Sequence, residues 1–123
     1  MYRLALRTVV CFASLLPASI ASAQVAGVSG TLIITNKAPY TATIVDVASG
    51  ATLATLPTGV GPHEVVVSSD GRTAVVTDYG TGPQPGSTLT VIDVPARKIV
   101  RTISIAPAMR PHGIVFLPGD TLV

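Results

Sequence analysis

Two histidines are the residues of this sequence best suited to chemistry. His63 and His112 are the only ones, and each follows a proline. Imidazoles bind metal ions and transfer protons near neutral pH, so a metal pair or an acid/base group is one interpretation. The other interpretation, which we favour, is structural: each ring hydrogen-bonds locally and holds a turn, because both histidines occupy one position of a repeat. No carboxylate or second histidine stands at a metal-ligand spacing such as H-x-x-x-H, so the sequence predicts no metal site.

Two aspartates also recur at equivalent places. Asp46 and Asp93 each end an apolar run and precede a turn-forming segment. A carboxylate there could bind calcium or act as a catalytic acid. More commonly it accepts backbone N–H groups of the coming turn, and we assign both aspartates this structural role.

The segment least similar to the repeat follows Asp78 and Tyr79. Residues 80–87 read GTGPQPGS and predict the longest loop of the chain. Loops on a rigid scaffold often bind ligands, so Asp78, Tyr79 and Gln84 are the predicted ligand-contacting residues. The glycines do not make a phosphate loop, since no Lys-Ser/Thr pair follows them. No G-x-S-x-G, H-E-x-x-H or paired haem cysteine motif occurs, so we predict no catalytic residue and no cofactor.

The first 23 residues have the layout of a secretory signal peptide. Arg3 and Arg7 precede a short apolar stretch, and Ala21-Ser22-Ala23 supplies the small residues of a cleavage site. The stretch is too short to cross a bilayer, which takes about 20 apolar residues. We therefore expect a periplasmic or secreted bacterial product without a stable membrane anchor. The only cysteine, Cys11, would be removed, which excludes disulfides and thiolate sites.

Composition narrows the possible partners. Hydrophobic residues make up 48% of the chain and charged residues 11%, which excludes a disordered tail. Beyond residue 23 the chain holds six basic and six acidic residues. Without a basic surface, nucleic acid is an unsuitable partner, which leaves an unknown protein or small-molecule ligand.

Short strands must position these residues. Runs rich in Val, Ile, Leu and Thr alternate with Gly- and Pro-rich turns, and no window shows capped helical periodicity. The predicted strands are 31–35, 42–47, 52–56, 64–68, 73–77, 88–94, 98–105 and 113–117. Several are apolar on both faces, so both faces must be covered. The prediction is an all-β chain of four-stranded antiparallel sheets.

An internal repeat organises the strands. Asp46 matches Asp93 at an offset of 47, and Pro62-His63 matches Pro111-His112 at an offset of 49. The full unit contains PHEVVVSSDGRTAVVTD at residues 62–78, LTVIDV at 89–94 and KIVRTI at 98–103. Units of this length, with four short strands, are typical of β-propeller blades.

This unit resembles the YVTN-type β-propeller repeat. It departs from that repeat at Glu64, where glycine is usual, and at Asp78, where asparagine is usual. The resemblance implies a partial blade over 30–57, a complete blade over 62–105 and the start of a third over 112–123, all within a partial propeller of residues 24–123. It also implies an incomplete ring, with further blades after Val123, so we expect an N-terminal fragment.

The resemblance leaves two functions open. One is an exported binding or scaffold module with an unknown ligand. The alternative is part of a propeller enzyme subunit of the quinoprotein or amine dehydrogenase-like type, because similar propellers occur in those enzymes.

Overall fold

The computed structural model describes residues 27–123, which form nine β-strands. The predicted signal peptide, its cleavage site after Ala23 and Cys11 lie outside the described residues. In residues 27–123 there is no helix that is long and apolar enough to cross a membrane. The predicted all-β class, with a four-stranded antiparallel sheet, is confirmed.

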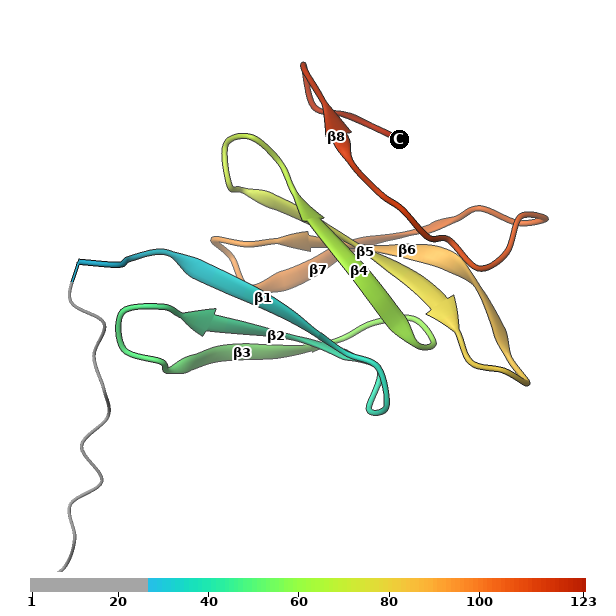
Figure 1. The fold of residues 1–123 in the computed structure, drawn as a ribbon, viewed down its shortest axis with the longest axis horizontal. Coiled ribbons are helices and arrows are strands. Elements are labelled where there is room, and N and C mark those ends of the chain that lie inside the picture. Colours follow the sequence, from blue (N-terminus) through green and yellow to red (C-terminus); the bar gives the residue numbers. More distant parts are fainter. Residues whose placement is uncertain (1–26) are drawn as a thin grey trace, which may run out of the picture.

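The strands form three antiparallel sheets that follow one another along the chain (Figure 1). The four-stranded sheet lies between the three-stranded sheet and the C-terminal hairpin (Figure 1). The first sheet contains β1 (Thr31–Asn36), β2 (Thr41–Asp46) and β3 (Thr52–Pro57). The second contains β4 (Pro62–Val67), β5 (Thr73–Gly80), β6 (Pro85–Asp93) and β7 (Lys98–Ser104), in that order, and the hairpin contains β8 (Phe116–Leu117) and β9 (Thr121–Leu122).

Glycine conformation and hydrogen bonds in the turns allow strands that follow one another in sequence to pair. Between β4 and β5, Gly71 takes a φ of 72°, a conformation that residues with a Cβ adopt at a cost. The Asp70 carboxylate accepts the Arg72 N–H at 2.9 Å and the Ser68 hydroxyl at 2.7 Å. These local bonds hold the hairpin, so sequence neighbours pair in space.

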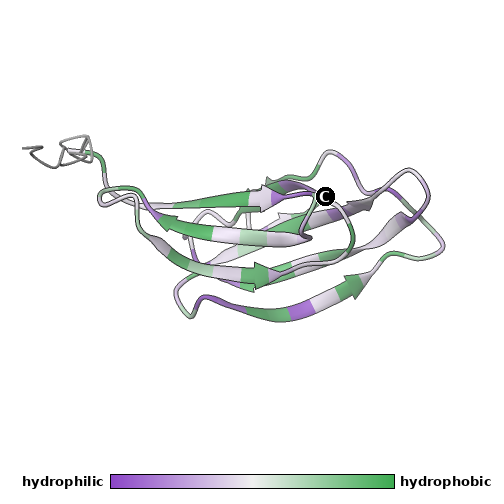
Figure 2. Ribbon diagram, turned by 90° about the horizontal axis from the view of Figure 1, so that it is seen from below, coloured by the Kyte–Doolittle hydropathy of each residue, from purple (hydrophilic) through white to green (hydrophobic). Residues whose placement is uncertain are grey.

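The core lies between the two larger sheets. Ala42 and Ile44 of β2 face Ala74 and Val76 of β5, and all four are completely buried. Residues two apart on a strand point to the same face, which explains both pairs. Ile92 of β6 is buried in the same cluster. Apolar stretches run along the strands of both sheets (Figure 2), so each sheet covers one face of the other.

The predicted loop over residues 80–87 is wrong. β5 continues to Gly80 and β6 begins at Pro85, and these two residues pair, so only residues 81–84 form the turn. Glycine permits this extension: a Cβ on Gly86 would overlap the Asp78 carbonyl oxygen. Asp78 and Tyr79 consequently lie in a strand, not in a loop.

The predicted strand over 113–117 is also too long. Only Phe116 and Leu117 are assigned to β8. Gly113 has a φ of 72°, which interrupts an extended strand, and its N–H donates to the Glu64 carboxylate instead of to a sheet neighbour.

Candidate functional site

Three rings gather beside β4, at the edge of the four-stranded sheet. The ring centroids of His63 and His112 lie 4.7 Å apart, and that of Tyr79 lies 5.2 Å from His63 and 5.8 Å from His112. We call His63, Tyr79 and His112 the ring cluster. Its members come from β4, from β5 and from the segment after β7, so it forms only when all three segments are in place.

Hydrogen bonds to β1 and to β5 fix the backbone of β4 around His63. The His63 carbonyl accepts the Thr35 hydroxyl of β1 at 3.2 Å. The N–H of Glu64 donates to the Thr77 hydroxyl of β5 at 3.0 Å. Thr77 and Tyr79 are two residues apart on β5 and therefore share a face of the sheet. The strand pairing thus places Tyr79 against His63.

His112 is positioned by Arg110. Arg110 adopts a φ of 59°, which is uncommon for a residue with a side chain, and its N–H donates to the Gly86 carbonyl at 2.7 Å. Its guanidinium donates to the Gly82 carbonyl at 3.1 Å. Both bonds attach the segment after β7 to the β5–β6 hairpin, so His112 returns to His63 although 49 positions separate them in sequence.

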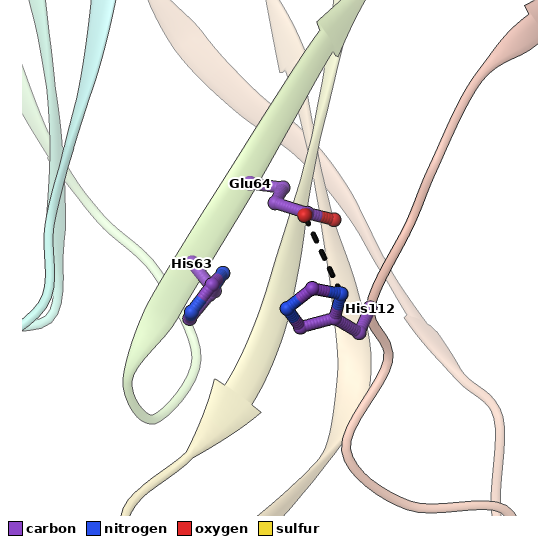
Figure 3. Close-up of side chains that lie close together, drawn as sticks. All are labelled: His63, Glu64 and His112. Atoms are coloured by element: carbon purple, nitrogen blue, oxygen red, sulfur yellow. Dashed lines mark ion pairs between the residues drawn. The ribbon is translucent and has the colours of Figure 1, made fainter.

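Glu64 is the site residue that sequence analysis missed. Its carboxylate accepts the Gly113 N–H, and its Oε1 lies 3.5 Å from Nδ1 of His112 (Figure 3). The available signal was its departure from the repeat: the equivalent position in the next unit is Gly113. A carboxylate therefore stands where that unit has no side chain, and it reaches across to that unit.

Three side chains converge in a way that can hold a cation. His63, Glu64 and His112 each offer one ligand atom, and these atoms all lie within 4.8 Å of one another (Figure 3). The side chain of His112 is 57% exposed and that of Glu64 is 32% exposed. The group therefore opens to solvent and can exchange ligands.

The predicted local hydrogen bond of the His63 ring is absent within residues 27–123. That ring instead contacts the rings of His112 and Tyr79. The physical reason is its position on an edge strand, where the side chain projects toward the next unit and not back onto its own turn.

Two cations lie on Tyr79. The Lys37 ammonium lies 5.1 Å from the ring centroid, and the Arg110 guanidinium lies 5.2 Å from it. Such distances are typical of cation–π contacts. The ring cluster therefore has two cations on its tyrosine and one carboxylate, that of Glu64, beside His112.

Asp78 lies in a different environment. It is completely buried, and its carboxylate accepts the hydroxyls of Thr88 at 2.7 Å and Thr90 at 2.9 Å. The Gly59 N–H, from the linker between the sheets, donates to it at 3.1 Å. Burial raises the pKa of Asp78 above its usual value, although these three hydrogen bonds act in the opposite direction. Asp78 therefore connects β5, β6 and the linker through hydrogen bonds, and its side chain does not lie in an open loop.

The remaining predicted residues lie elsewhere. Gln84 is exposed on the short turn between β5 and β6. Asp46 accepts the Ser49 N–H at 2.8 Å, and Asp93 accepts the Ala96 N–H at 2.9 Å, each in the turn after its strand. Hydrogen bonds from the side chain and backbone of Ser49 lower the pKa of Asp46. None of these three side chains takes part in the ring cluster.

An apolar pocket adjoins His112. It has a volume of about 210 Å³ and lies between the four-stranded sheet and the C-terminal segment. Leu89 of β6 lines one side, and Ile114 and Val123 line the other. His112 borders both the pocket and the ring cluster, so the two form one continuous surface.

The fold of this chain is similar to that of a protein of solved structure. The sequence matches no protein-family model, and a search of curated proteins gives no match. Among solved structures, similarity is found to Kuenenia stuttgartiensis hydrazine synthase, which contains β-propeller domains, with a TM-score of 0.66 and 23% identity. The match covers 73% of this chain and 24% of that one. At this identity the likeness shows the fold alone.

Proposed function

We propose that this chain is an exported β-propeller module of the YVTN type that serves as a binding scaffold in the bacterial periplasm or outside the cell. The observation that carries the proposal is the ring cluster. Two exposed imidazoles beside a half-buried tyrosine ring, at the edge of a sheet, are the kind of surface that binds ligands. The proposed export rests on the features of residues 1–23.

Ring signals in NMR test the binding function. His63 and His112 are the only histidines, so their ring protons give two readily assigned pairs of signals, one pair from each residue. We expect carboxylates, amines, inorganic phosphate or metal ions, added singly, to move these signals and those of Tyr79. The amide signal of Gly71 is the control, since Gly71 lies in the β4–β5 turn, at the opposite end of β4 from His63. A panel that moves none of the cluster signals would contradict the binding function.

Two further measurements separate the other parts of the proposal. The intact mass of the periplasmic product should correspond to a chain beginning at Gln24, and a product that retains Arg3 and Arg7 would contradict export with cleavage. Amine-dependent reduction of an artificial electron acceptor would favour the enzyme alternative over a binding scaffold.

A further inference from the structure

The structure assigns a binding site for a divalent transition-metal ion to His63, Glu64 and His112. This inference rests on the proposed binding function, because it names a ligand for the same surface. The three donors belong to two repeat units: His63 and Glu64 lie on β4, and His112 lies in the segment after β7. A bound ion would therefore join the two units.

The donor set selects the class of metal. Two imidazoles and one carboxylate are the protein ligands of several zinc sites that keep an open position. Imidazole suits zinc, copper, nickel and iron, whereas magnesium and calcium prefer sites made of oxygen alone. The set therefore favours a zinc-like ion over magnesium.

The geometry is close to that of a bound state. Ligand atoms around a tetrahedral zinc ion lie about 3.4 Å apart, as follows from bonds of about 2.1 Å. Here the candidate atoms lie within 4.8 Å, and His112 Nδ1 is already 3.5 Å from Glu64 Oε1. Because His63 and His112 are exposed, small rotations of their side chains bring the donors together without disturbing the core.

The ligands are also available. Within residues 27–123 no hydrogen bond engages the His63 ring, so binding breaks no existing bond there. The Gly113 N–H donates to the second oxygen of Glu64, which orients the carboxylate toward His112. Such partners of a metal ligand fix its direction and strengthen binding.

Nearby positive charges determine which kind of ligand the open coordination position of the metal favours. Lys37 and Arg110 lie on the Tyr79 ring, and their positive charges lower the affinity for the metal ion itself as well as for a second cation. The same charges favour an anion at the fourth position of a bound metal. The proposed site therefore takes a metal ion together with an exchangeable ligand.

Zinc titration of the tag-free exported chain tests the site. Zinc chloride alone, added in a buffer that does not chelate it, should move the ring signals of both histidines with one equivalent bound. Magnesium chloride should move neither. Cobalt should give the visible absorption of a site with nitrogen ligands. Movement of a single histidine, or the absence of any movement up to millimolar zinc, would overturn the site.

Variants locate the ligands. We expect His63→Gln and His112→Gln each to weaken zinc binding at least tenfold and the double variant, which has no histidine, to lose it. Glu64→Gln should weaken zinc binding by a smaller factor. Asp93→Asn, which changes a half-buried carboxylate outside the cluster, should not alter it. Unchanged affinity in the double variant would overturn the proposal. Retained amide spectra verify that each variant folds.

The two proposals fail differently. If zinc leaves the ring signals unchanged while carboxylates, amines or phosphate move them, the metal site is wrong and the binding function stands. If no probe moves them, both are wrong.

Discussion

Two neighbouring residues of β5 face opposite sides of the sheet and take part in polar groups of opposite character. Asp78 points toward the linker between the sheets, where Thr88, Thr90 and Gly59 donate to it. Tyr79 points toward His63 and His112, which are exposed. The first group is buried and each of its donors is used, whereas the second is open to solvent and its ion pair, between His112 and Glu64, is partly exposed.

This difference distinguishes a side chain that stabilises the fold from side chains that can bind a ligand. A buried carboxylate surrounded by donors has little capacity for an outside ligand, and removing it leaves the donors without partners. Exposed imidazoles remain solvated, so they can exchange water for a ligand at low cost. A polar residue of these sheets therefore indicates function when its neighbours leave its donor or acceptor atoms available.

The largest expected effect is on the buried side. Asp78→Ala leaves two hydroxyls without their acceptor in a buried site and removes one of the two acceptors of the Gly59 N–H, and we expect the free energy of unfolding to fall by about 3 kcal/mol. Urea unfolding measures it. Asp93→Ala is the matched control, because Asp93 caps an exposed turn, and its loss should be about 1 kcal/mol or less. Equal losses would show that burial does not distinguish these aspartates.

Gly59→Ala should have the next largest effect. A Cβ at this position would overlap the Asp78 carboxylate and lie 2.7 Å from the Thr88 hydroxyl. We expect a loss of about 2 kcal/mol, as overpacking in a closed site usually gives. Gly82→Ala is the control, since a Cβ there meets nothing within 4 Å. A Gly59→Ala variant as stable as Gly82→Ala would mean that the linker can move away from Asp78.

The sequence predicted the all-β fold better than it predicted the buried group around Asp78. The all-β class follows from short apolar runs separated by Gly and Pro turns, a local pattern. The burial of Asp78 does not, because it depends on the linker at Gly59 and on the pairing of β5 with Thr88, which lie 19 and 10 residues away. The extension of β5 and β6 requires the close approach at Gly86, which propensity does not reveal.

The candidate site shows the same limit. The repeat singled out His63 and His112 as equivalent positions, and equivalence in a repeat favoured identical local roles. Equivalent residues of adjacent units can also meet each other, and the ring cluster joins two such units. Spacing along the chain therefore could not predict the group that includes Glu64.

The effect of pH on the free energy of unfolding should be smaller than these two losses. It reports only on the buried group around Asp78. Burial raises the pKa of Asp78 in the folded protein, so between the unfolded and folded pKa values the folded state holds more protons. The free energy of unfolding relative to Asp78→Asn should therefore rise as the pH falls through the folded pKa. Comparison with this variant cancels the opposite contributions of Asp46 and Asp70, whose pKa values are lowered. A difference that is flat with pH, measured by urea unfolding, would contradict the raised pKa.

The smallest effect is expected at Glu64. Without a metal, Glu64→Gln removes the charge facing His112, but both side chains contact solvent, and exposed ion pairs contribute about 0–1 kcal/mol. Glutamine keeps an oxygen that can accept the Gly113 N–H, so we expect a loss below about 0.5 kcal/mol that shrinks further at high salt. Urea unfolding at two salt concentrations, in the presence of a chelator, measures it. A loss as large as that of Asp78→Ala would show that Glu64 stabilises the contact between the two repeat units. The contrast between the two faces of β5 would then be wrong.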